Sequence, residues 1–216
     1  MKKSMLIAIV LTTATLSLKA QTTFGIKGGG NQNTFYLKSE DTGGDTRYTL
    51  TNPGFHFGGI VNLQVSEHFS VQPQLLLVNK GGKLKMGGDE TEFNFYTIDV
   101  PVNLLYNYNG FFIGGGPFIS VGLSAKGKST GSPDVDLYDD DALGAGSNFK
   151  RFEIGGNVLM GFKFPSGFMV STNWAPGISD IYAEPSGGTG SAKASNSFWG
   201  FSVGYMFGGN KTAKKK

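Results

Sequence analysis

The chain has 216 residues, with 34 glycines, 18 phenylalanines and no cysteine, and 16% of its residues are charged. This length suits a single domain with its own core. The charged fraction is low beside the about 25% of ordinary soluble domains, which argues against a typical cytosolic enzyme and against a disordered chain. The lack of cysteine excludes disulfides, thiolate metal sites and a cysteine nucleophile.

The first 20 residues have the anatomy of a signal peptide. Lys2 and Lys3 form a basic start, residues 5–11 are continuously apolar, and the segment closes on Ala20. We predict export with cleavage after Ala20, because the apolar stretch is too short to cross about 30 Å of hydrocarbon as a helix. Without Lys2, Lys3 and Lys19 the chain has 16 basic and 16 acidic residues, so its charge gives no reason to expect nucleic-acid binding.

Beyond the leader, apolar and polar side chains alternate in eight segments bounded by Gly, Pro, Asn, Asp or Ser. Phe152 and Ile154, for example, are separated by Glu153. A period of two places alternate side chains on opposite faces of a β-strand. In chain order, the predicted strands are 23–31, 55–64, 69–80, 93–106, 111–126, 151–164, 168–175 and 199–207.

The connections between these segments alternate in length. Asn109 and Gly110 are a strong hairpin signal, because both residues tolerate the positive φ of a two-residue turn. Long connections at one end and tight turns at the other predict an eight-stranded antiparallel up-and-down barrel, since a meander without helices buries its apolar face by closing. The short turns are 65–68, 107–110 and 165–167, and the long polar connections are 32–54, 81–92, 127–148 and 180–196.

The two faces of the strands distinguish a membrane barrel from a soluble one. One face is bulky and apolar, with aromatic residues near the strand ends, as an interfacial girdle requires. The other face carries glycines, amides and too few charges for a surface in water. We therefore predict that residues 21–207 form an all-β transmembrane barrel of the outer membrane, in contact with lipid and lipopolysaccharide. The predicted girdle residues are Phe24, Phe55, Tyr96, Tyr106, Phe164, Trp174, Trp199 and Phe207.

The charges on the polar face are expected to pair inside the barrel, because an unpaired charge in a narrow lumen is costly. A lumen filled in this way predicts a plugged barrel, whereas an unfilled lumen would leave a small porin. The predicted interior network consists of Lys27, His56, Asp99, Arg151, Glu153 and Lys163.

Catalysis and metal binding have weak support in the sequence. Lipid-modifying catalysis would need a serine and a carboxylate beside His56, and the neighbour of His56 on its own face is Gly58. We expect no catalytic residue and no cofactor. Aspartates crowd the third long connection, where we expect a solvated acidic loop, with divalent bridging to lipopolysaccharide phosphates as the alternative. These aspartates are Asp134, Asp136, Asp139, Asp140 and Asp141.

Six motifs, taken in order, resemble the outer-membrane β-barrel family of Bacteroidota that includes PorT-like proteins and is grouped with the porin family. Asn103, Leu105 and the basic tail at 208–216 depart from the pattern of that family. The resemblance implies a barrel, and for PorT itself a link to protein secretion and gliding. The motifs are FGIKGG at 24–29, GFHFGGIVNLQVSEHFSVQPQLLLVNKGGKL at 54–84, IDVPVNLLY at 98–106, GFFIGGGPFISVGLSAK at 110–126, FEIGGNVLMGFKF at 152–164 and FSVGYMF at 201–207.

These observations together favour a non-enzymatic barrel. Its long connections, above all 32–54 and 127–148, are expected to carry a structural, adhesion or envelope-partner role. A small porin and a PorT-like role in secretion are the alternatives.

Overall fold

The computed structural model describes residues 22–41, 44–86, 89–129, 131, 133–139, 148–183 and 191–208. The predicted signal peptide, residues 1–20, lies outside the described residues, as does the predicted basic tail apart from Gly208. In the part of the chain that is described, no helix has the length and apolar character needed to span a membrane.

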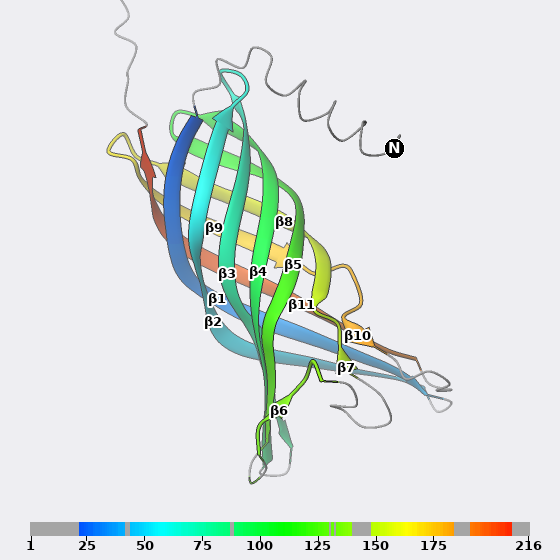
Figure 1. The fold of residues 1–216 in the computed structure, drawn as a ribbon. Helices are drawn as coiled ribbons and strands as arrows, with labels where there is room; N and C mark the ends of the chain where they lie inside the picture. The colour runs from blue at the N-terminus through cyan, green and yellow to red at the C-terminus, as the bar shows by residue number, and fades with distance from the viewer. Residues whose placement is uncertain are drawn as a thin grey trace, which may run out of the picture.

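Eight long antiparallel strands close into a barrel (Figure 1). Each long strand pairs with the next one along the chain, and the pairing of β11 with β1 closes the ring. The predicted all-β up-and-down barrel is therefore confirmed. The long strands are β1 (Thr22–Asp41), β2 (Gly44–Gln64), β3 (Phe69–Met86), β4 (Asp89–Tyr108), β5 (Phe111–Ser129), β8 (Phe152–Lys163), β9 (Phe168–Pro176) and β11 (Ser191–Phe207), and the short ones are β6 (Val135–Asp136), β7 (Asn148–Phe149) and β10 (Tyr182–Ala183).

The strands turn apolar side chains outward and polar or small side chains inward. Along β8, Phe152, Ile154 and Val158 are exposed, whereas Glu153 and Asn157 are buried. All eight aromatic residues predicted for the girdle are exposed as well. This arrangement inverts that of a soluble protein and is typical of a barrel surrounded by lipid.

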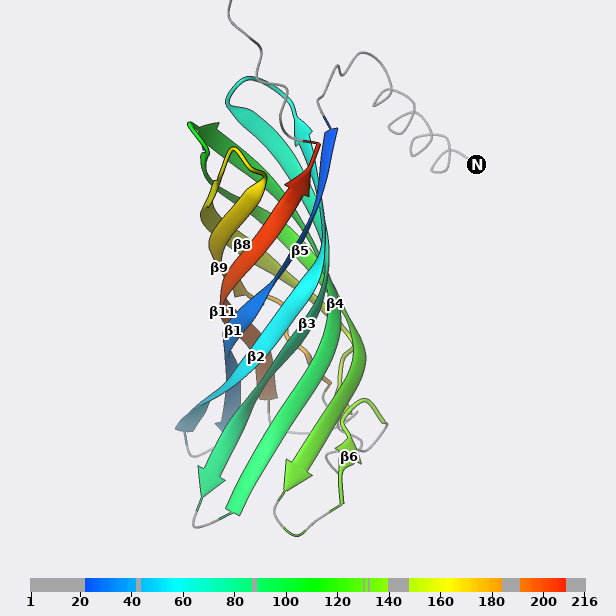
Figure 2. The ribbon, with the colours of Figure 1, turned by 90° about the vertical axis from the view of Figure 1, so that its left-hand side faces the viewer.

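The two ends of the barrel differ as the sequence predicts. Tight turns follow β2, β4 and β8 at one end, the turn end, where β1 begins and β11 finishes (Figure 2). Asn109 and Gly110 have φ values of 49° and 87°, the positive φ expected of a two-residue hairpin. The opposite end is the loop end, which faces outside the cell in barrels of this class.

Two connections predicted as loops are mostly strand. β1 and β2 stay paired as far as Asp41 and Gly44, and β3 and β4 as far as Met86 and Asp89. The prediction of loops at 32–54 and 81–92 was wrong because it required apolar alternation. The inward positions of 32–54 hold the buried amides Asn33 and Asn52 as well as the buried Phe35 and Leu50, so burial alternates along these strands although apolar character does not.

Toward the loop end the barrel wall opens into two three-stranded arms (Figure 1). One arm consists of β11, β1 and β2, and the other of β3, β4 and β5. In the wall, β2 and β3 pair up to His56 and Val78, and beyond that point the described residues form one further pair, Thr51 with Lys83. We call this sparsely paired stretch the β2–β3 seam.

Asparagine side chains bridge the β2–β3 seam. The side-chain amides of Asn31 and Asn33, on β1, donate to the backbone oxygen of Asn79, on β3, at 3.0 and 3.2 Å. They pass Gly54 of β2, where an added Cβ would lie 2.5 Å from both the Asn33 amide nitrogen and the Asn79 oxygen. The seam is therefore held by side chains where the backbone ladder is sparse, and it depends on a glycine.

Candidate functional site

The loop end of the interior is closed by an aromatic layer. Phe35 packs against Phe95 and Phe149, with ring centroids 5.6 and 5.8 Å apart. Phe35 belongs to one arm, Phe95 to the other, and Phe149 to the connection after β5, so the layer joins the arms and covers the interior. Its buried members are Phe35, Leu50, Phe95, Ala125, Leu137, Phe149, Ile181 and Ala194.

A buried charged cluster lies beneath the aromatic layer. The Lys80 ammonium is 3.0 Å from the Asp99 carboxylate and 2.9 Å from the Glu153 carboxylate. The hydroxyls of Ser120 and Thr97 donate to Asp99 at 2.5 and 2.7 Å. All five side chains are buried. Buried charges are tolerated when they are both paired and hydrogen-bonded, and this cluster meets both conditions.

His56 takes part in a second polar cluster. Its Nε2 atom is 2.7 Å from the Ser202 hydroxyl, and its Nδ1 atom is 3.2 Å from the side-chain oxygen of Asn31. A serine, a histidine and an orienting amide resemble a nucleophilic triad in connectivity. Ser202, however, is 0% exposed and His56 is 1% exposed. The Ser202 hydroxyl therefore has no surface at which a substrate could react.

Side-chain amides continue the polar filling toward the turn end. Asn173 donates to Asn157 at 3.1 Å, and Asn157 donates to Asn103 at 2.7 Å. Asn103 and Leu105 are both buried in the interior. The amides are followed by an apolar layer toward the turn end, and other buried apolar side chains, Phe118 and Phe198 among them, pack beside Lys80 and His56. The apolar layer consists of Ile60, Leu105, Phe112, Leu159, Met169 and Met206.

Four of the six residues predicted for the interior network are buried inside the barrel: Lys27, His56, Asp99 and Glu153. Of these, Asp99 and Glu153 belong to the Lys80 cluster, and His56 bonds to Asn31 and Ser202. Lys27 lines a cavity of about 10 Å³ together with Asp99. With Lys80, these residues give the interior two ammonium groups against two carboxylates, a balanced charge.

Arg151 and Lys163 do not belong to the charged cluster. Arg151 precedes β8 and is exposed, and its guanidinium lies 4.3 Å from the centre of the Tyr138 ring. The interior position predicted for Arg151 is wrong, because the ladder of β8 starts at Phe152 and the guanidinium reaches water. Lys163 is the last residue of β8, is half-buried, and lines the mouth of the barrel at the turn end.

Sequence reasoning missed Lys80, which holds the charged cluster together. Its position on the polar face of the segment at 69–80 was the available signal, because Gln72 and Gln74 on that face are also buried. From the sequence alone, a lysine at the end of a predicted strand is as compatible with a position in water as with a buried one.

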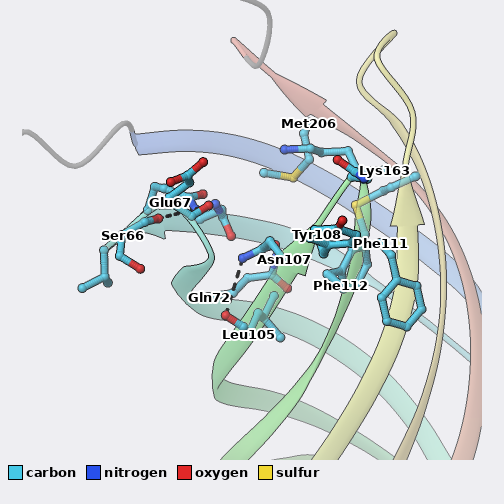
Figure 3. Close-up of a pocket in the computed structure, with 16 residues that line it drawn as sticks. Ser66, Glu67, Gln72, Leu105, Asn107, Tyr108, Phe111, Phe112, Lys163 and Met206 are labelled. Carbon is cyan, nitrogen blue, oxygen red and sulfur yellow. Dashed lines mark hydrogen bonds between the residues drawn. The ribbon is translucent and has the colours of Figure 1, made fainter.

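An open cavity of about 570 Å³ lies at the turn end (Figure 3). Glu67 and Lys163 lie on opposite sides of it, with Asn107 between them (Figure 3). Leu105 and Met206 belong both to its lining and to the apolar layer, so the cavity ends against that layer.

Three of the aspartates considered for metal binding, Asp134, Asp136 and Asp139, are described, whereas Asp140 and Asp141 lie outside the described residues. Asp134 is 3.6 Å from the Lys128 ammonium, and Asp136 accepts the backbone N–H of Tyr138 at 3.0 Å. Within the described ranges, no group of three or more His, Cys, Asp or Glu residues could hold a metal ion.

A closed antiparallel barrel with an apolar exterior and a filled polar interior defines the class of membrane-spanning β-barrels. The chain belongs to the outer membrane protein beta-barrel domain family, which it matches over residues 19–183. Membership of this family implies a location in the outer membrane. No curated protein matches the chain.

Several solved structures have a similar fold at low identity. Neisserial surface protein A is 12% identical, with 85% of this chain and 97% of that chain covered and a TM-score of 0.48. The outer membrane protein OprG from Pseudomonas aeruginosa is 12% identical, with 87% and 97% covered and a TM-score of 0.41. Ail, the attachment invasion locus protein of Yersinia pestis, is 11% identical, with 84% and 98% covered and a TM-score of 0.41. The family match, and not these distant structures, carries the assignment.

Proposed function

We propose that the protein is a closed outer-membrane barrel that presents its two arms at the cell surface for a structural, adhesive or partner-binding role. The observation that carries this proposal is the contrast between a filled interior and strands that continue far beyond the girdle. In β2, residues 44–54 lie beyond the girdle residue Phe55, which is about 35 Å of strand. A barrel that only anchors itself has no need of this extension.

The filled interior argues against passive diffusion. A solute crossing the barrel would have to displace the aromatic layer, the Lys80 cluster and the apolar layer in succession. A small polar solute would gain nothing from the two apolar layers, which exclude water. The small porin is therefore the second candidate function, and a conductance measurement distinguishes it from the closed barrel.

The test is conductance of the detergent-purified full-length protein in planar bilayers, beside its gel mobility before and after boiling. Mobility that changes on boiling, without conductance steps, supports the closed barrel. Steady conductance would overturn the closed interior and make the porin the leading function. A protein that needs no detergent would contradict the membrane placement itself.

The role of the arms is tested by shortening the β1–β2 hairpin. Leu37 and Tyr48 are register partners, so residues 37–48 can be replaced by an Asn-Gly turn while Phe35 and Leu50 remain in the aromatic layer. We expect the shortened barrel to stay heat-modifiable. Cross-linking on intact cells should recover a partner with the full chain and lose it with the shortened one. Recovery of the same partner by the full and the shortened chain would show that the β1–β2 hairpin does not bind it.

The absence of catalysis is part of the proposal and is supported by the complete burial of Ser202. Cells that express Ser202→Ala should have the same lipid A as cells that express the wild type. A difference in lipid A between the two would support an enzymatic function. A PorT-like role in secretion is supported by the sequence resemblance alone. Comparing protein secretion in a strain with and without this chain would test it directly.

A further inference from the structure

The outward face of β1 forms the floor of a groove on the lipid-facing surface. Along β1 the outward positions in this stretch are Ile26, Gly28, Gly30 and Gln32. Gly28 pairs with a residue of β2 on one side and of β11 on the other, and so does Gly30. We call this feature the β1 groove. Its walls are Phe57 and Val203 beside Gly28, and Phe55 and Phe201 beside Gly30.

The β1 groove is large enough to hold a ligand. Two hollows, of about 530 and 440 Å³, lie over Gly28 and Gly30, which are two residues apart on the same face. The walls stand well clear of the floor, because Phe57 and Phe201 are 54% and 60% exposed while the glycines have no side chain. The floor is thus low because of two glycines and the walls are high because of aromatic residues.

Packing within the barrel does not explain these two glycines. At the intervening Gly29, an inward-pointing Cβ would collide with the backbone oxygen of Phe201, so glycine is required there. At Gly28 the nearest atom to an added Cβ would be 3.5 Å away and at Gly30 3.9 Å, which are ordinary contacts. Neither residue has a positive φ. A strand glycine without a packing reason can mark close approach by a ligand, and here two such glycines lie two residues apart on one face, between exposed Phe57 and Phe201.

The polarity of the β1 groove varies along its length. The hollow over Gly28 is bordered by Ile26, Phe57 and Val203, whereas the hollow over Gly30 reaches Gln32 and Trp199. Trp199 belongs to the girdle, the level at which hydrocarbon gives way to head groups. The six residue steps from Ile26 to Gln32 span about 20 Å. At the usual strand tilt this is about 15 Å of depth, half of the ~30 Å hydrocarbon core.

We propose that the β1 groove is a site for one acyl chain of an outer-membrane lipid, with its ester end beside Gln32 and Trp199. The groove is continuous with the surface that meets hydrocarbon. It is apolar from Ile26 to Gly30 and becomes polar at Gln32, the end toward the head groups. These properties match a lipid chain better than a second copy of the barrel, because a symmetric contact would set the same glycine floor of each copy against the other and leave the space between them unfilled. The proposal rests on the outer-membrane placement and adds a lipid site to it.

The test uses the two tryptophans of the chain as reporters. Trp174 and Trp199 stack with ring centroids 5.9 Å apart, so fluorescence reports on the polar end of the groove. Phosphatidylcholine brominated near the ester end of its chains is titrated into the full-length protein in detergent micelles. The filled variant is Gly28→Leu with Gly30→Leu. The matched control is Gly156→Leu on β8, where an added Cβ would also meet open space.

The wild type and Gly156→Leu should show saturable quenching, and the filled variant should need about tenfold more lipid for half-quenching, because leucines occupy the place of the chain. Linear quenching in the wild type, or equal curves for wild type and filled variant, would overturn the proposal. So would a chemically cross-linked dimer that the filled variant alone loses. Heat-modifiable gel mobility, measured for each variant, shows whether the barrel is intact. Loss of lipid binding by an intact barrel is thereby distinguished from loss of the membrane barrel itself.

Discussion

The ammonium group of Lys80, on β3, lies 2.9 Å from a carboxylate oxygen of Glu153, on β8, although these strands are not neighbours in the barrel. The contact crosses the interior. Asp99, on β4, is 3.0 Å from the same ammonium, so one cation links three strands. This arrangement makes Lys80 the residue on which the interior charge balance depends.

Replacing Lys80 by methionine should strongly destabilise the barrel. Lys80→Met keeps much of the side-chain volume and leaves the carboxylates of Asp99 and Glu153 buried without the cation that contacts both of them. Removing one partner of a buried ionic cluster costs about 3–5 kcal/mol. Urea unfolding in detergent micelles, followed by tryptophan fluorescence, measures the change in the free energy of unfolding.

The control for Lys80→Met is Lys128→Met, which removes an exposed lysine 3.6 Å from Asp134. An exposed pair contributes at most about 1 kcal/mol, so this variant should unfold close to the wild type. Adding Asp99→Asn and Glu153→Gln to Lys80→Met should recover part of the loss. Equal midpoints for Lys80→Met and the wild type would show that the cluster does not stabilise the fold.

A methyl group at Gly54 should loosen the β2–β3 seam. In Gly54→Ala the new Cβ would lie 2.5 Å from the Asn79 oxygen and 2.8 Å from the Asn31 amide nitrogen, so the bridging amides must move. We expect a loss of about 1–3 kcal/mol in the free energy of unfolding. Gly156→Ala, with nothing within 4 Å of its added Cβ, is the control and should unfold like the wild type. Similar losses in both variants would mean that a flexible strand, and not the seam, is being affected.

The barrel and its two ends could be predicted because their signals are local. A period of two along 152–164 is enough to separate outward Phe152 from inward Glu153, and the positive φ of Asn109 and Gly110 follows from residue type. The same rule placed Lys27, His56 and Asp99 on the inward face, where they are buried.

The arms, the β2–β3 seam and the role of Lys80 could not be read in the same way. Whether residues 32–41 continue β1 depends on the pairing of β1 with β2 and β11, which polar sequences do not reveal. The bond from Asn31 to Asn79 joins residues 48 positions apart, and its existence depends on the absence of a side chain at Gly54. Three-dimensional register, and not composition, decides these features.

The contact between His56 and Ser202 should contribute to stability and not to catalysis. Ser202→Ala removes the partner of His56 Nε2 in a buried site, and an unsatisfied buried polar group costs about 1–3 kcal/mol. The measurement is a double-mutant cycle of Ser202→Ala and His56→Ala in urea unfolding. Strictly additive losses would show that the two side chains are not coupled.

Tyr138 should ionise at unusually high pH. Burial raises the pKa of the Tyr138 phenol to about 12, while the Arg151 guanidinium over its ring acts in the opposite direction. The folded state therefore favours the neutral phenol, and the stability that Tyr138 contributes is fully present below its unfolded value of about 10 and is lost as the pH rises through about 12. The difference in tyrosinate absorbance between the wild type and Tyr138→Phe, followed with pH, isolates this group among the eight tyrosines. A difference curve with a midpoint near pH 12 is expected. A midpoint near 10, the ordinary value, would show that Tyr138 is solvated and that it does not pack over Gly122 at the loop end of β5.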